Sequence, residues 1–295
     1  MRIKKIIFIT TMIIATSLGG VKAYIDHQLG VELNTSLKSI ADIATIDYSE
    51  VSTSLLGSAY IRNMHLSMPG YAPVSIDTIT LYKAYQFYNP KKLPQQISIA
   101  IEGVQFPISD TATPAPILVS ALGYAPYYFT PKELRHLGYA RINADIGIKL
   151  KQQGENKISL WGAINALAWG ELTLSTDLIN IPDIASLPTA AQQVQLTALT
   201  FSYTDNGLFN RLFTMLAKRN KMTVAHLKQS LINKLKGDLS QMRLDASILT
   251  SLQQFIQTPD KLIILMQPNS PVTINTLLLT SPKRMGLKMR ARNSN

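Results

Sequence analysis

The sequence predicts an α+β protein: an N-terminal signal or anchor helix, an antiparallel β-sheet with one apolar face, and a helical C-terminal third. Three observations predict this class. The chain starts with basic residues followed by an apolar run. Apolar and polar residues alternate in several stretches between residues 60 and 203, and apolar residues then recur at helical spacing over 206–257. Alternation indicates half-buried strands, and helices can cover one face of such a sheet.

Residues 1–23 have the pattern of an export segment. Arg2, Lys4 and Lys5 precede an apolar run over residues 6–21. The run is shorter than the ~20 apolar residues of a full membrane span, and small residues follow it, as at a signal-peptide cleavage site. A cleaved signal peptide and a retained transmembrane helix both stay open. The basic start predicts that the rest of the chain crosses to the periplasmic side of the inner membrane.

Residues 24–106 predict a helix followed by a β-rich region. Residues 24–44 place apolar side chains at helical spacing, which predicts a helix packed on the body of the protein. Alternating patterns then predict three strands, over residues 60–68, 74–82 and 96–104. Residues 107–131 contain five prolines and are expected to form a joint, with a short apolar helix near 117–122.

Residues 132–204 predict a short helix and an antiparallel meander. The most regular alternation in the chain lies here: even positions from 140 to 150 are apolar, and most odd positions are polar. We therefore expect Ile142, Ile146, Ile148 and Leu150 to be buried, and Arg141, Asp145 and Lys149 to face water. The sequence leaves open what covers the apolar face: the protein's own helices, which we favour, a lipid or a partner protein.

Residues 205–295 predict a mainly helical region with a basic tail. Three amphipathic helices are expected over 206–220, 223–238 and 245–257. Asp245 is a suitable N-cap for the third helix, and Pro259 follows its end. A buried strand is expected near 261–268, and the basic tail covers 283–292.

The sequence contains no common catalytic or metal-binding signature. The absence of cysteine excludes disulfides, thiolate metal sites and thiol catalysis. Nucleophile-elbow, phosphate-loop, dinucleotide-binding and zinc-protease motifs are also missing. The four histidines, His27, His65, His136 and His226, are far apart in the sequence. We therefore predict no enzyme activity, and no catalytic, cofactor-binding or metal-ligating residue.

Composition restricts the expected partners. The net charge is +11 although only 16% of residues are charged, which suits anionic lipid or glycan. No motif that reads nucleic acid is present, so nucleic acid is not an expected partner. Aromatic residues alternate with lysines around residues 81–92, a pattern compatible with a sugar or headgroup contact. For Trp161 and Trp169, structural packing is favoured over a ligand site.

The stretch IDYSEVSTSLLGSAYIRNMHLSM, residues 46–68, follows the export segment and the first predicted helix. This order resembles Gram-negative envelope proteins of the AsmA-like and YdgA-like kind. The resemblance implies a membrane-associated periplasmic protein that binds envelope lipid or supports envelope maintenance. The alternative is an accessory subunit that binds envelope proteins in a secretion or cell-surface assembly. The helical C-terminal third departs from this pattern, and no functional residue is carried over from it.

Overall fold

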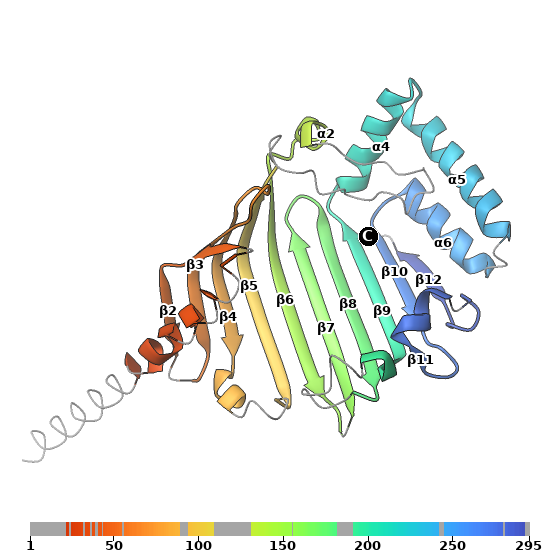
Figure 1. Cartoon of the computed structure of the whole chain (residues 1–295). Coiled ribbons are helices and arrows are strands. Elements are labelled where there is room, and N and C mark those ends of the chain that lie inside the picture. The colour runs from red at the N-terminus through yellow and green to blue at the C-terminus, as the bar shows by residue number, and fades with distance from the viewer. Residues whose placement is uncertain are drawn as a thin grey trace, which may run out of the picture.

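The computed structural model shows a single twelve-stranded antiparallel sheet (Figure 1). The structure describes these residues: 22–23, 25–31, 33–35, 37–38, 41–42, 44–54, 56–88, 94–108, 131–154, 156–181, 191–241, 245–279 and 281–292. The main strand order is β1-β3-β4-β5-β6-β7-β8-β9-β10-β12, with β2 paired to β3 and β11 paired to β9. The predicted antiparallel sheet is therefore confirmed.

The strands have the following bounds: β1 (Thr45–Asp47), β2 (Glu50–Thr53), β3 (Ala59–Ser67), β4 (Val74–Tyr82), β5 (Gln96–Pro107), β6 (Arg141–Gln152), β7 (Lys157–Ala166), β8 (Gly170–Ile179), β9 (Gln195–Asp205), β10 (Lys261–Met266), β11 (Val272–Thr273) and β12 (Lys288–Arg292). From β3 to β10, each strand pairs with the strand before it in the sequence. The pair β5–β6 joins the regions before and after residues 109–130 into the same sheet.

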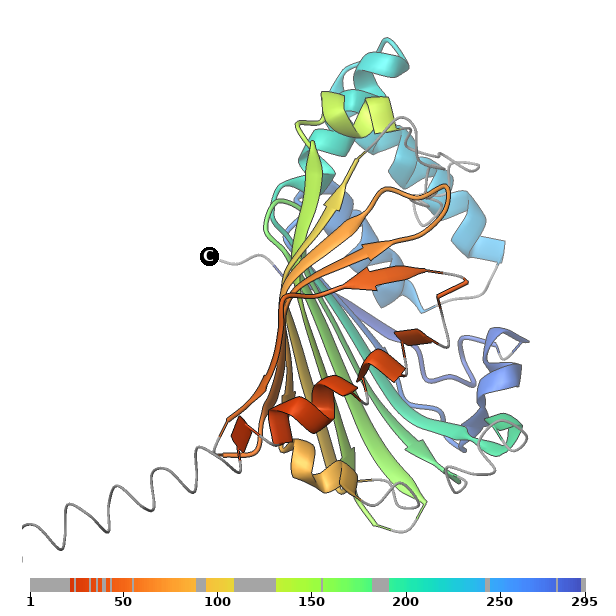
Figure 2. The ribbon, with the colours of Figure 1, turned by 60° about the vertical axis from the view of Figure 1, so that its left-hand side comes forward.

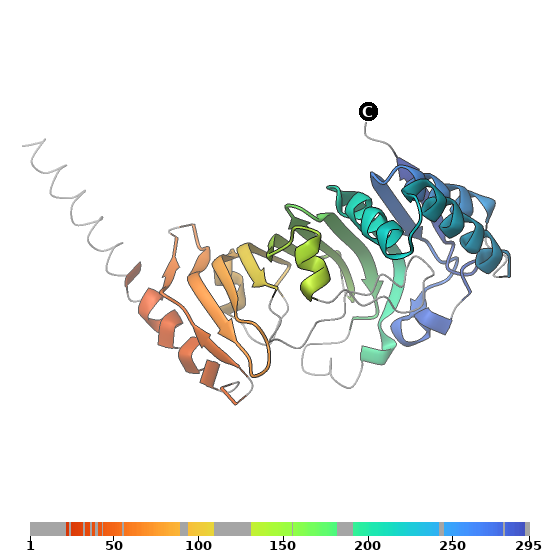
Figure 3. The ribbon, with the colours of Figure 1, turned by 90° about the horizontal axis from the view of Figure 1, so that it is seen from above.

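The helices lie on one side of the sheet or at its upper edge (Figures 2 and 3). The described residues between 22 and 38 are helical. The other helices are α2 (Pro131–His136), α4 (Leu208–Arg219), α5 (Val224–Gln241) and α6 (Ala246–Gln257), with short 3-10 segments η1 (Ala84–Tyr88), η4 (Ala191–Gln193) and η5 (Ile274–Leu279). As predicted, Asp245 caps α6, accepting a hydrogen bond from the Ser247 amide at 2.8 Å.

The best-buried core of the protein lies within the helices α4, α5 and α6. Amphipathic stripes at helical spacing bring their apolar side chains together away from water. This core contains Phe213, Leu216, Ala217, Leu227, Leu231, Ile232 and Ile256, each at most 4% exposed. The predicted C-terminal helices are thus confirmed, and they enclose a core of their own beside the sheet.

The helices pack on the apolar face of the sheet. Ile142 of β6 packs against the cluster that contains Leu212 of α4. The ring of Tyr203 in β9 lies 6.2 Å from that of Phe255 in α6. Successive side chains of a strand point to opposite faces, so Ile146, Ile148 and Leu150 share the face of Ile142.

A β-bulge in β5 keeps the apolar residues on that face. The register against β6 shifts between Ile101 and Val104. Gly103 adopts a left-handed conformation with φ 66°, and a Cβ there would come 2.1 Å from the Asp77 carboxylate. The Asp145 carboxylate accepts a hydrogen bond from the Gly103 amide at 2.8 Å. Glycine is therefore required at the bulge, and Asp145 fixes it.

Two expectations are corrected. In the part of the chain that the structure describes, no helix combines the length and the apolar character needed to cross a membrane, so the transmembrane-helix prediction is wrong there. The segment that motivated it, residues 1–23, lies outside the described residues except for Lys22 and Ala23. The C-terminal third is not mainly helical to its end, because the basic tail forms the edge strand β12.

The burial expected for β6 also needs correction. Arg141, Asp145 and Lys149 are exposed as predicted. The apolar face is only partly covered: Ile146 and Leu150 are half-buried, and Ile148 is 36% exposed. The short helix expected near 117–122 lies outside the described residues.

Candidate functional site

Three surface features outside the helical core could bind a ligand. We call the first the central apolar face: the large apolar side chains of β5–β8 on the helix side of the sheet. Its members are Ile97, Ile99, Ile101, Val104, Phe106, Ile142, Ile146, Ile148, Leu150, Ile158, Leu160, Ile164, Leu172, Leu174 and Leu178. All these strand residues are described, and none of the fifteen is fully buried.

The exposure is greatest at the middle of the central apolar face. Ile164 pairs with Ile146 across β6–β7 and is 41% exposed, beside the 36% exposed Ile148. Ile142, nearer α4, belongs to a packed cluster instead. The helices therefore cover the end of this face and leave its middle partly open to water.

The second feature is a groove of about 700 Å³ between α2 and α4, which we call the helix groove. It is lined by Glu133, His136, Leu137, Asn210, Arg211, Thr214, Met215, Lys218 and Arg219. The Arg219 guanidinium donates a hydrogen bond to the Glu133 carboxylate. Three basic side chains, Arg211, Lys218 and Arg219, therefore line the groove with one carboxylate, and an anion is the favoured ligand of the groove.

Arg211 is held in the helix groove by Tyr139. Its guanidinium carbon lies 5.2 Å from the centre of the Tyr139 ring, in cation–π contact. Burial raises the pKa of the Tyr139 phenol, and the Arg211 charge opposes this in part. The Tyr139 hydroxyl donates to the Ala168 carbonyl at 3.0 Å. The phenol thus stays neutral, and its ring contacts the guanidinium of Arg211.

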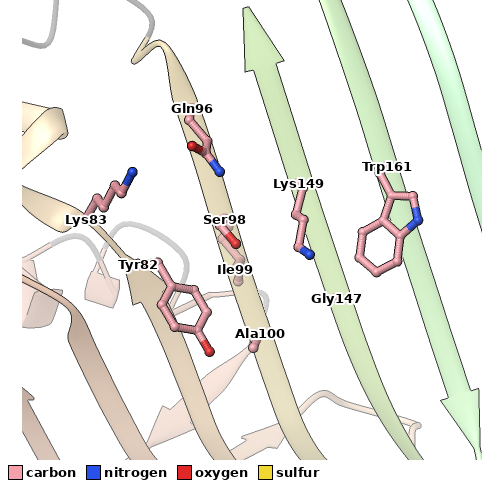
Figure 4. Close-up of a pocket in the computed structure, with 9 residues that line it drawn as sticks. All are labelled: Tyr82, Lys83, Gln96, Ser98, Ile99, Ala100, Gly147, Lys149 and Trp161. Carbon is pink, nitrogen blue, oxygen red and sulfur yellow. The ribbon is translucent and has the colours of Figure 1, made fainter.

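The third feature, the tryptophan hollow, is a depression of about 480 Å³ on the polar face of the sheet (Figure 4). It is lined by Tyr82, Lys83, Gln96, Ser98, Ile99, Ala100, Gly147, Lys149 and Trp161. Strand register brings these residues together. Tyr82 pairs with Ser98, Ser98 with Lys149, and Lys149 with Trp161, so four of them form one row across β4–β7.

Small residues form the floor of the tryptophan hollow. Ala100 and Gly147 pair with each other in the neighbouring row. A Cβ at Gly147 would lie 3.1 Å from the Trp161 ring, so the glycine leaves room for the indole beside it. The Lys149 ammonium lies 4.7 Å from the centre of that ring. Lys149 therefore places a cation next to an aromatic surface.

The two tryptophans considered as ligand contacts lie in different parts of the structure. Trp161 and the Tyr82–Lys83 pair meet in the tryptophan hollow, a meeting that sequence spacing does not reveal. Trp169 instead packs against Tyr139, with ring centres 5.3 Å apart, as predicted for a structural residue. Among the described residues, no three histidines or carboxylates come close enough to hold a metal ion.

The comparisons with known proteins add no functional assignment. A family model described only as an uncharacterized protein matches residues 163–292, from within β7 to the end of β12. No curated protein and no solved structure matches the chain. The resemblance to AsmA-like and YdgA-like proteins is not tested by these findings and stays a prediction.

Proposed function

We propose that this protein is a non-catalytic binder of an anionic lipid. The acyl chain lies along the central apolar face, and the anionic head lies in the helix groove. One observation carries the proposal: fifteen large apolar side chains on neighbouring strands share a face, and none is fully buried. Contiguous apolar surface of this kind is rare on soluble monomers unless it binds something.

The energetics favour an apolar occupant for this face. Removing apolar surface from water is favourable by about 25 cal/mol per Å². The middle of the face, around Ile148 and Ile164, retains this potential because the protein's own helices leave it partly open. An acyl chain offers apolar contact without polar groups that would need partners.

The helix groove and the central apolar face lie next to the same buried cluster, which contains Tyr139 and Leu212. Leu137 and Met215 line the groove and pack against this cluster, as does Ile142, the first apolar residue of β6. The four residue-to-residue steps of a strand from Ile142 to Ile146 span roughly 13 Å. One leaflet of a bilayer has a hydrocarbon depth of about 15 Å. A lipid with its head in the groove would therefore reach the exposed middle of the face.

Binding of cis-parinaric acid, a fluorescent acyl chain with a carboxylate head, tests the proposal. We expect saturable binding to the purified full chain. Ile164→Asn should weaken it about tenfold, because a polar group enters the path of the chain. Lys218→Glu should weaken it similarly by repelling the carboxylate. Binding that is absent, or unchanged in both variants, would overturn the proposal.

Matched controls lie on the opposite face of the same strands. Asn165→Asp, next to Ile164, and Lys151→Glu, on the exposed side of β6, change charge without touching either feature. Both should bind parinaric acid within about twofold of the unaltered protein, an effect smaller than ~0.4 kcal/mol. A second copy of the chain is the competing occupant of the central apolar face, and sedimentation tests it. If the protein is a dimer that covers this face and excludes parinaric acid, the occupant is the second copy and not a lipid.

The proposed location is the periplasmic side of the inner membrane, following the pattern of residues 1–23. A fusion of residues 1–45 to alkaline phosphatase should be active in cells, because this enzyme folds only after export to an oxidising compartment. A stable but inactive fusion would contradict the location and leave the binding proposal to be judged separately.

A further inference from the structure

The tryptophan hollow lies on the face of the sheet opposite the central apolar face, and it has its own chemistry. Lys83 and Lys149 contribute two ammonium groups. None of its nine lining residues, all of them described, carries a carboxylate. The hollow is therefore electropositive and suits a ligand with an acidic group.

Aromatic side chains mark the two ends of the hollow. Tyr82, on β4, is 43% exposed, and Trp161 lies three strands away on β7. With neighbouring strands ~4.8 Å apart, the two residues are separated by about 14 Å. Aromatic faces are electron-rich and attract the positively polarised C–H groups of a sugar ring. Two such faces at this spacing fit a short oligosaccharide better than a single small ion.

Between the two aromatic residues lie groups that can bind hydroxyls. The Ser98 hydroxyl and the Gln96 amide each donate and accept hydrogen bonds. The small floor residues Ala100 and Gly147 let a ring approach the sheet closely. A volume of about 480 Å³, with several polar groups around a floor of small residues, is large enough for a small ligand.

We propose that the tryptophan hollow binds an acidic oligosaccharide. The Lys149 ammonium lies over the ring of Trp161. A sugar ring packs against the indole next to this ammonium, and the carboxylate of that sugar or the next pairs with it. Lys149 is already held there, 4.7 Å from the ring centre, so little ordering is needed on binding. The site is distinct from the lipid proposal because the side chains that would contact the sugar lie on the opposite face of the sheet; of the nine lining residues, Ile99 alone also belongs to the central apolar face.

Calorimetry with trigalacturonic acid tests the site on the full chain. We expect maltotriose, a neutral trisaccharide, to bind at least tenfold more weakly, since it lacks the carboxylates. Lys149→Met should weaken trigalacturonate about tenfold while keeping the length of the side chain. Trp161→Leu should do the same by removing the aromatic face. The control Lys151→Met, on the same side of β6 and outside the hollow, should change binding less than twofold.

The outcomes distinguish the proposal from its competitors. The proposal is overturned if Lys149→Met and Trp161→Leu bind trigalacturonate as tightly as the control Lys151→Met does. It is also overturned if the unaltered protein binds maltotriose as tightly as trigalacturonate. Inorganic phosphate that binds as tightly as trigalacturonate would indicate a simple anion site without sugar recognition. If a mononucleotide binds more tightly than trigalacturonate, the proposal is overturned, and the ligand is a base stacked on Trp161. Circular dichroism melts of each variant confirm that a loss of binding is not a loss of fold.

Discussion

A single carboxylate on the water-facing side of a strand supports the bulge at which the register between β5 and β6 shifts. Asp145 is exposed, as the alternation of β6 predicts, yet it accepts the hydrogen bond of the Gly103 amide in the bulge of β5. The bulge shifts the pairing by one residue, and the residues beyond it would otherwise point to the wrong face. A surface position therefore has a structural role that its exposure alone would not suggest.

Replacing this carboxylate should have a measurable effect on stability. We expect Asp145→Ala to lower the free energy of unfolding by about 1 kcal/mol, because the bulge amide loses a charge-assisted partner at a solvent-exposed site. Denaturant unfolding measures this value. Asn143→Ala, on the same side of β6, should change stability by less than ~0.5 kcal/mol. An equal loss in both variants would show that Asp145 does not support the bulge.

Asp26 connects the N-terminal helical segment to the sheet. Its carboxylate accepts hydrogen bonds from the amide and the hydroxyl of Thr53 in β2, both at 2.6 Å, and pairs with Lys22. Burial raises the pKa of Asp26, but the hydrogen bonds from Lys22 and Thr53 and the Lys22 charge outweigh it, and the net pKa is lowered. The folded protein therefore favours the charged form.

This lowered pKa predicts that the contact is lost in acid. The stabilisation is complete above the ordinary pKa of about 4 and is lost as the pH falls through the lowered folded value. The protection factor of the Thr53 amide in hydrogen exchange should fall over this range. In Asp26→Asn, protection should not change over this pH range, because the amide side chain does not titrate. A pH-dependent protection factor that survives in Asp26→Asn would assign the effect to another group.

At the scale of elements, the helical core and the sheet differ in how completely they bury apolar side chains. Leu231 in α5 is 1% exposed, whereas Ile164 in β7 is 41% exposed. We expect Leu231→Ala to cost about 3 kcal/mol, because it leaves a cavity in a closed core. Ile164→Ala should cost about 1 kcal/mol, because water already reaches that side chain. Thermal or denaturant unfolding of the two variants measures the difference, and similar losses would mean that Ile164 is buried in solution.

Sequence patterns predicted the helices and strands better than they predicted which side chains other elements cover. Alternation in β6 correctly assigned its two faces, but it could not show how far helices cover one of them, because cover depends on distant packing. The alternation of Met289 and Ala291 with basic residues was a strand signal, which the density of charge in this segment obscured. The tryptophan hollow depends on the register of four strands, and Lys83, Lys149 and Trp161 are too far apart in sequence to indicate it.

At the scale of the whole molecule, both ends of the sheet are poor templates for further strands. One end consists of two short strands paired to β3: β1 with three residues and β2 with four. β12, at the other, exposes Lys288, Arg290 and Arg292. Short edges and edge charges discourage pairing between molecules. The basic tail expected from sequence thus protects the edge that it forms.

Removing these edge charges should promote association. We expect the triple variant Lys288→Thr, Arg290→Thr and Arg292→Thr to form oligomers at concentrations where the unaltered protein does not, because its β12 keeps its strand propensity without the repulsion. Analytical ultracentrifugation measures the change. A variant at the exposed Lys218, Lys221 and Lys236, with the same loss of charge, serves as the control. If both triple variants associate equally, net charge rather than the edge strand is responsible.

The order of the strands also sets the order in which the molecule can be assembled during synthesis. From β3 to β10 every strand pairs with the one made just before it, so the sheet can extend as the chain emerges, without waiting for distant partners. Helices α4, α5 and α6 are inserted between β9 and β10 and emerge only after the middle of the sheet is complete. The nascent protein must therefore carry β5–β8 with their apolar side uncovered for a time, and these strands are the segment on which a chaperone would act first.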